Sequence, residues 1–127
     1  MSSLMERIKQ KAKSDRKRIL LPEGSEERTL RAAEKITAEG IADLTLLGDE
    51  TEIRASAEKL GVSLGGISIV NPLTDPDLGA YTDAFYELRK EKGVTPEKAA
   101  STMKNPLFFA AMMIKKGRAD GMVAGAL

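Results

Sequence analysis

The chain has 127 residues, of which 42% are hydrophobic and 31% are charged, a composition typical of a folded globular domain rather than a disordered segment. Lysine and arginine total 20 against 19 acidic residues, so the net charge of +1 gives no general attraction to nucleic acid or to an anionic membrane. Because Cys and His are both absent, disulfides, zinc sites built on thiolates or imidazoles, and Cys–His or Ser–His–Asp catalytic sets are excluded from this chain.

The N-terminal third predicts a helix, a buried strand and a second helix. Apolar residues at positions 4, 8 and 12 have helical spacing. The run Ile19–Leu21 is short, apolar and followed by proline and glycine, as a buried strand often is. We expect Ser25 to cap the helix that follows and Gly40 to end it.

The strand and helix pattern then repeats along the chain. Strands are predicted at 44–47 and 67–70, on either side of a helix at 50–60 that Gly61 ends. Further helices are predicted at 78–90, from Pro96, and at 107–116, before a fourth strand at 121–125. Helix 107–116 is apolar nearly all round, so we expect it to be buried. Alternating strands and helices predict an α/β fold with a parallel sheet covered on both faces.

The segments that flank these elements give no sign of export or of a membrane span. The N-terminus lacks an apolar run of signal-peptide length, and the longest apolar run, 107–114, is far shorter than the roughly 20 residues that a membrane span needs. We therefore expect a cytoplasmic protein with no membrane partner.

In open parallel sheets, ligands bind outside the carboxyl ends of the strands. In this sequence those ends lie at 22–24, 48–49, 71–72 and 125–126, and none carries GxGxxG or GxxxxGK followed by Ser or Thr. This absence argues against a Rossmann or P-loop nucleotide site.

Two arginines are candidates for holding an anion. Arg28 lies in the first turn of its predicted helix, where the helix dipole disfavours a cation, so an external anion would explain it. A solvated arginine paired with a nearby glutamate explains it as well, and the sequence alone favours that plainer explanation. Arg89 lies at a predicted helix C-terminus, where a cation is favoured in any case.

Several strings, in the same order along the chain, resemble the beginning of phosphate acetyltransferases. They cover nearly the whole sequence: ILLPEG at 19–24, ERTL at 27–30, GIAD at 40–43, LLG at 46–48, AFYELRK at 84–90, AMM at 111–113 and ADG at 119–121. The resemblance implies a two-domain α/β architecture similar to isocitrate and isopropylmalate dehydrogenases. Residues 1–127 would then be the N-terminal part of the first domain, a partial, truncated three-layer sandwich. The chain also stops directly after a predicted strand, where a parallel fold normally adds a helix.

The family resemblance also implies a reaction. Its members move an acetyl group between coenzyme A and inorganic phosphate, with the CoA thiolate as nucleophile, a carboxylate as base and arginines on the phosphate. Arg28 and Arg89 match family arginines implicated in binding CoA or phosphate, and we expect them to form half of one anion-holding cleft whose opposite wall lies outside residues 1–127. No catalytic residue, metal ligand or covalently bound cofactor is implied for residues 1–127, because the serine and threonine loop and the other catalytic elements lie further along family chains. The segment alone is expected to be inactive.

Alternatives remain open at this point. A phosphate butyryltransferase would share the same motifs, since the acyl pocket is not visible here. A non-catalytic binding or oligomerisation module could use the same fold, as the family-like region attached to malic enzymes does. Because a truncated fold leaves apolar surface uncovered, we also expect a homo-oligomer.

Overall fold

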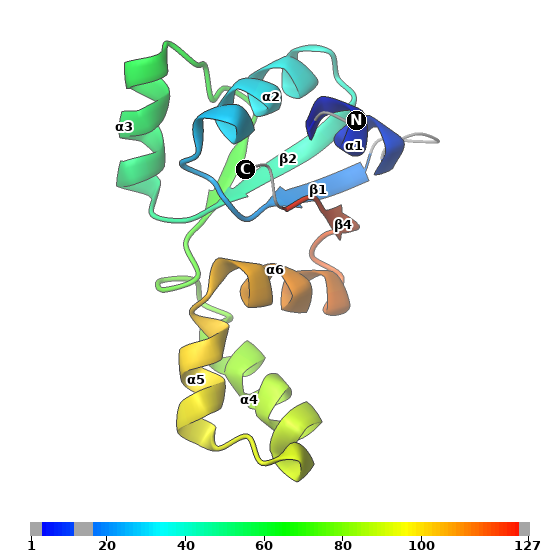
Figure 1. Ribbon diagram of the computed structural model, residues 1–127, viewed down its shortest axis with the longest axis vertical. Coiled ribbons are helices and arrows are strands. Elements are labelled where there is room, and N and C mark those ends of the chain that lie inside the picture. The colour runs from blue at the N-terminus through cyan, green and yellow to red at the C-terminus, as the bar shows by residue number, and fades with distance from the viewer. Residues whose placement is uncertain (1–3, 12–16, 125–127) are drawn as a thin grey trace.

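A computed structural model describes residues 4–11 and 17–124 of the chain (Figure 1). Its centre is a parallel sheet with the strand order β3-β2-β1-β4. The strands are β1 Lys17–Leu21, β2 Ala42–Leu47, β3 Ser68–Val70 and β4 Gly121–Met122. Ile19 lies opposite Leu44 of β2 on one side and Gly121 of β4 on the other. The first strand therefore pairs directly with the last one. The predicted fourth strand is shorter than expected, and residue 125 lies outside the described residues.

One face of the sheet is covered by three helices. These are α1 Leu4–Lys11, α2 Glu27–Ala38 and α3 Glu50–Leu60. Alternate residues of the strands point to this face and form an aliphatic core with the helices: Ile19, Leu21, Leu44, Leu46, Leu30, Ile36 and Ile53. Burying each such side chain contributes about 1.5–3 kcal/mol, which makes this face a main source of stability.

The opposite face is covered by the second half of the chain. Its helices are α4 Leu78–Arg89, a 3-10 turn at Lys90–Lys92, α5 Pro96–Met103 and α6 Pro106–Lys115. Leu20 and Leu47 of the sheet pack here with aromatic and methionine side chains, including Phe109 and Met112. Figure 1 shows α6 next to the sheet, with α4 and α5 extending away from it. Helices on both faces confirm the predicted three-layer α/β arrangement.

The helix ends show which sequence signals the fold uses. Asp49 caps α3 through the Glu52 backbone N–H, and Gly61 ends it in a left-handed conformation, so the predicted bounds 50–60 are correct. The expected cap of α2 is wrong, however. Glu26, not Ser25, is the N-cap, because its longer side chain reaches back to accept from the Thr29 backbone N–H.

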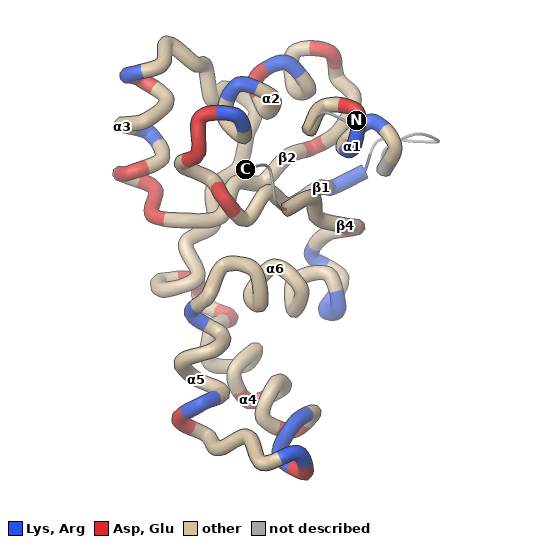
Figure 2. Tube along the Cα trace, viewed as in Figure 1, with Lys and Arg blue, Asp and Glu red and all other residues tan. Residues whose placement is uncertain are grey.

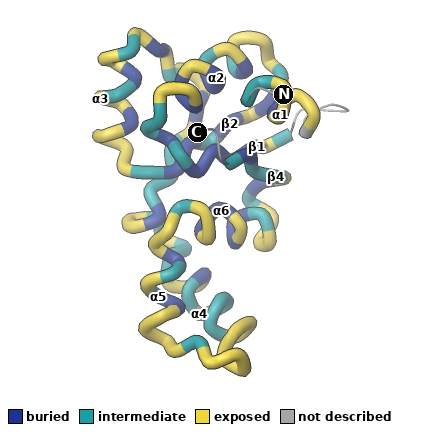
Figure 3. The backbone as a smooth tube through the Cα atoms, in the orientation of Figure 1, coloured by how far each residue is buried: buried dark blue, intermediate teal, exposed yellow. Residues whose placement is uncertain are grey.

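The prediction that α6 is buried all round is also wrong. Phe109, Met112 and Met113 are buried, but Leu107 and Phe108 are each 44% exposed. Figure 3 shows exposed positions along α6, and also along α4 and α5. Helix α6 therefore carries more apolar side chains than its one buried face can accommodate. Within the described part of the chain, no helix combines the length and the apolar character needed to cross a membrane.

Candidate functional site

The turns at the carboxyl ends of β1 and β2 are fixed by backbone hydrogen bonds. The Gly24 N–H donates to the Leu47 carbonyl (3.2 Å), and the Gly48 N–H donates to the Val70 carbonyl (3.0 Å). A Cβ at position 24 would lie 2.5 Å from the Leu47 carbonyl oxygen, so only glycine fits there. These turns place the starts of α2 and α3 beside each other at the edge where parallel sheets bind ligands.

A groove of about 320 Å³ opens at this edge beside β3, and its polar lining is largely acidic. Asp49 and Asn71 already accept backbone hydrogen bonds from Glu52 and Leu73, at 2.9 and 3.0 Å. Asp75, which also lines the groove, accepts hydrogen bonds from an arginine of a distant segment. Carboxylates repel phosphate, so this groove does not suit an anionic ligand. Among residues 4–11 and 17–124, no group of three or more carboxylates could hold a metal ion.

Arg28 lies on the face of the sheet covered by α1–α3. It is exposed in the first turn of α2 and lines a groove of about 430 Å³ between α1 and α2. Leu4, Met5 and Ala32 give that groove apolar walls, and Lys35 also lines it. Figure 2 shows that basic and acidic positions are interspersed along α2, and Glu34 lines the same groove.

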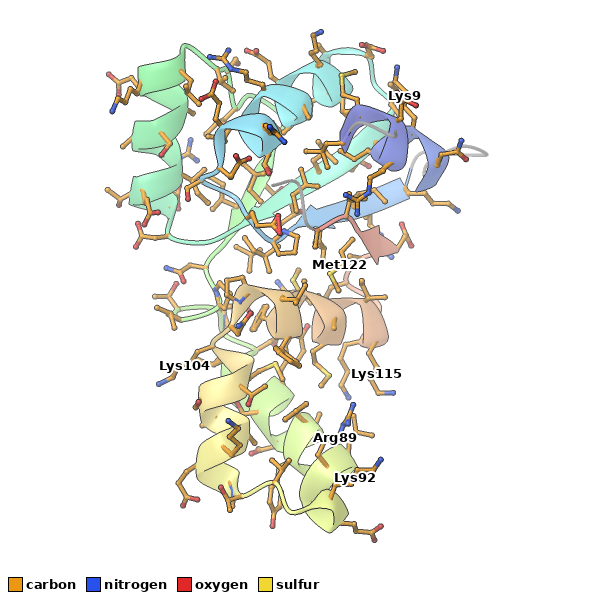
Figure 4. The ribbon with its side chains drawn as sticks, in the orientation of Figure 1. Lys9, Arg89, Lys92, Lys104, Lys115 and Met122 are labelled. Carbon is orange, nitrogen blue, oxygen red and sulfur yellow. The ribbon has the colours of Figure 1, made fainter. Side chains whose placement is uncertain are left out.

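Arg89 lies on the other face, at the last turn of α4. Its guanidinium is 5.9 Å from the centre of the Phe85 ring, a distance at which a cation is attracted to an aromatic face. It lines a groove of about 240 Å³ between α4 and α6, and Phe108 and Lys115 of α6 line the same groove. In Figure 4, Arg89 and Lys115 lie on the same side of the molecule. The groove thus has aromatic walls and two cations from different helices.

The structure does not bring Arg28 and Arg89 into one groove. Each lines its own groove, on helices that cover opposite faces of the sheet. It does place Arg89 in one groove with Lys115, a residue that was not among the predicted site residues. The sequence did contain a signal for this groove. Arg89 and Lys115 each lie in the last turn of a helix that also carries phenylalanine. The roles of Arg28 and Arg89 in binding CoA or phosphate stay predictions.

A polar cluster joins the start of α4 to the turn before β4. Arg118 donates to both carboxylate oxygens of Asp75, at 3.0 and 3.2 Å, to Asp77 at 2.9 Å and to the Tyr81 hydroxyl at 3.2 Å. Burial alone would raise the pKa of Asp75, but the hydrogen bonds from Arg118 and from the Asp77 backbone, with the positive charge of Arg118, lower that pKa overall. Asp75 is therefore a stable carboxylate at neutral pH.

Comparison with known proteins decides the family. Residues 3–127 match the family model described as phosphate acetyl/butaryl transferase. The chain belongs to this family. The resemblance predicted from the sequence motifs is thereby confirmed.

Members of the phosphate acetyl/butaryl transferase family also match in detail. The phosphate acetyltransferase of Thermoanaerobacterium thermosaccharolyticum is 50% identical over 125 residues, which are 98% of this chain and 38% of that protein. The Clostridium acetobutylicum phosphate acetyltransferase is 47% identical, over 98% of this chain and 37% of its own length. The EutD phosphotransacetylase from Staphylococcus aureus superposes with a TM-score of 0.82 at 35% identity, covering 98% of this chain and 37% of that one. This chain thus spans less than two-fifths of these relatives.

Proposed function

We propose that this protein transfers an acetyl group between coenzyme A and inorganic phosphate. The observation that carries the proposal is the match of residues 3–127 to the transferase family, on a fold that superposes on a phosphotransacetylase with a TM-score of 0.82. In the reaction, the CoA sulfur bonds to the acetyl carbon of acetyl phosphate while the bond from that carbon to the phosphate oxygen breaks. Phosphate leaves with the electron pair, and the thiol proton goes to a base. The nucleophile is part of the substrate, which is consistent with a chain that has no Cys and no His.

The contribution that we propose for residues 1–127 is anion binding rather than bond making. Arginine is well suited to phosphate groups, which CoA and the second substrate both carry. On one face, Arg89 and Lys115 stand beside aromatic walls, a combination that fits a phosphorylated ligand with a flat ring. On the other face, Arg28 lines a groove with apolar walls. The two grooves therefore bind different parts of the substrates or different substrates.

We further propose that residues 1–127 alone give no turnover. Catalysis by orientation of two substrates supplies about 7–11 kcal/mol in such reactions, and one wall of a divided site cannot orient both. The test compares the 127-residue chain with a chimera that joins it to the remaining part of the Thermoanaerobacterium relative. The release of CoA thiol from acetyl-CoA and phosphate is measured. We expect turnover from the chimera only, and turnover by the short chain at the chimera's rate would contradict this proposal.

The arginines are tested in the same chimera. Arg28→Ala and Arg89→Ala should each raise the KM for CoA or phosphate by about 10- to 100-fold, because hydrogen bonds to charged groups contribute about 1.5–3 kcal/mol. Arg54→Ala is the matched control, since Arg54 is exposed on α3 and pairs with Glu50 at 2.7 Å. Unchanged kinetic constants in both test variants would exclude them from the binding site.

A second candidate is transfer of a butyryl group, because the family description names both acyl groups. Comparing acetyl-CoA with butyryl-CoA in the chimera tests whether residues 1–127 contribute to the choice of acyl group. A chimera that folds and associates but never turns over would favour the non-catalytic module.

The homo-oligomer and the cytoplasmic location also remain our proposals. Leu73, Leu88, Leu107 and Phe108 are large apolar side chains that the structure leaves 44–60% exposed, which supports association. A single monomeric species in light scattering at high concentration would contradict the oligomer.

A further inference from the structure

We propose that Arg118 is a positioning residue that fixes the direction of α4 and thereby the place of Arg89. The catalytic relevance of Arg89 depends on the function proposed above, whereas the effect of Arg118 on α4 can be tested without it. Arg118 lies in the turn between α6 and β4 and lines neither of the grooves that contain the candidate arginines.

Arg118 connects two segments that are far apart in the chain. It comes from the α6–β4 turn and binds Asp75 in the β3–α4 loop, Asp77 at the helix start and Tyr81 in the first turn of α4. The contact with Asp75 uses two guanidinium nitrogens, a geometry that fixes orientation as well as distance. Its guanidinium also lies 5.8 Å from the centre of the Tyr81 ring.

Asp77 shows that this cluster takes precedence over helix capping. An aspartate at an N-cap normally accepts from a backbone N–H of the first turn. Asp77 occupies the N-cap position of α4 but makes no side-chain capping bond, and its carboxylate accepts from Arg118 instead. The start of α4 is therefore held from outside the helix.

Apart from this cluster, α4 is held by partial packing, because Leu78, Ala84 and Phe85 are only partly buried against the core. Tyr81 is the one buried residue of this helix, and its ring packs on Phe109 with centroids 5.0 Å apart. Arg89 lies eight residues further along, which is about 12 Å at the helical rise of 1.5 Å per residue. A tilt of about 10° at Tyr81 would move Arg89 by about 2 Å over this length, enough to disturb a bound phosphate.

The test measures the direction of α4 in the 127-residue chain. Because the chain has no cysteine, spin labels can be attached specifically at Ala38→Cys on α2 and Glu91→Cys beyond the end of α4, two exposed positions. Double electron–electron resonance then gives the distribution of distances between the labels. We expect one narrow population with Arg118 present and at least a twofold broader one with Arg118→Met. Arg118→Lys should give an intermediate width, because lysine keeps the charge without the two-nitrogen geometry.

Controls separate positioning from general damage. Arg54→Met removes an exposed arginine of similar size and should leave the distribution unchanged. Asp75→Asn is the milder second variant, since Arg118 can still bind Asp77 and Tyr81, and should broaden the distribution less than Arg118→Met does. An unchanged distribution in Arg118→Met would overturn the proposal. Loss of the folded circular dichroism signal in both Arg118→Met and Asp75→Asn would also overturn it, because a residue that only orients α4 should leave the sheet folded.

A second measurement connects the position of α4 to the ligand. In the chimera, Arg118→Met should raise the KM for CoA about tenfold while Arg118→Lys restores most of the affinity. If the distances change but CoA kinetics do not, Arg118 orients α4 and Arg89 is not part of the CoA site. Failure of the proposed function and failure of the positioning role are therefore distinguishable.

Discussion

The helices α2 and α4 have the same length but are used very differently by the fold. Each has 12 residues, and α2 buries five of them, whereas α4 buries only Tyr81. The same contrast holds for the two faces of the sheet. The α1–α3 face has an aliphatic core, whereas every large apolar side chain found exposed in the described residues lies in the β3–α4 loop, α4 or α6.

The comparison indicates a division in how completely the two faces are packed, with a candidate arginine on each face. A face that already buries its apolar residues stabilises the sheet, and a face that leaves them exposed is suited to contact another molecule or chain. Arg89 and Lys115 lie on the face covered by α4–α6, beside the exposed aromatic side chain of Phe108. If the division is correct, equivalent substitutions on the two faces should have unequal effects on stability.

The largest expected difference is between two leucines. Leu46→Ala removes a fully buried side chain from the α1–α3 face and should lower the free energy of unfolding by about 2–5 kcal/mol. Leu88→Ala removes a side chain that is 51% exposed on α4 and should change it by no more than about 0.5 kcal/mol. Urea denaturation followed by circular dichroism measures both. Equal losses would show that α4 is as well packed as the sheet.

The next largest contrast is between alanine substitutions at two glycines, which should change the stability in opposite directions. Gly24→Ala would place a Cβ against the Leu47 carbonyl and should destabilise the chain by about 1–3 kcal/mol. Gly79→Ala, in the first turn of α4, meets no atom within 4 Å and should stabilise it by about 0.5–1 kcal/mol. Thermal unfolding midpoints measure both effects. A destabilising Gly79→Ala would mean that something covers this part of α4 in solution.

The outcome for the sequence predictions follows the same division. The bounds of α3 were predictable because Asp49 and Gly61 act locally, within a few residues of the helix ends. The exposure of Phe108 was not predictable, because an apolar residue does not indicate whether anything packs against it.

Nor could the sequence show that Arg28 and Arg89 line separate grooves. That depends on which face each helix covers, and the strand order that places β4 beside β1 comes from long-range pairing. The same reason hid the contact of Arg118 with Asp75, two residues 43 positions apart.

Acid should weaken the cluster that anchors α4 before it affects the aliphatic core. The folded state lowers the pKa of Asp75 below its ordinary value of about 3.9, so the stabilisation is fully present above that value and is lost as the pH falls through the lower, folded value. Because Arg118 is about one-third exposed, the effect should not exceed about 1 kcal/mol. Urea midpoints of the unchanged chain and of Asp75→Asn should differ at pH 6 and converge towards pH 2. A difference that stays constant over this range would show that Asp75 contributes through shape rather than charge.

The smallest expected effect concerns a defect in the otherwise well-packed α1–α3 face. In the part of the chain that the structure describes, the Thr37 hydroxyl on α2 is buried without a hydrogen-bond partner. Thr37→Val replaces it with a methyl group of similar shape, and both residues are β-branched, so helix propensity changes little. Removing an unsatisfied hydroxyl should stabilise the chain by about 0.5 kcal/mol. The control is Thr51→Val on α3, where the threonine is exposed and solvent can reach it, so no gain is expected. If Thr37→Val instead destabilises the chain, a bound water satisfies the hydroxyl and the α1–α3 face has no such defect.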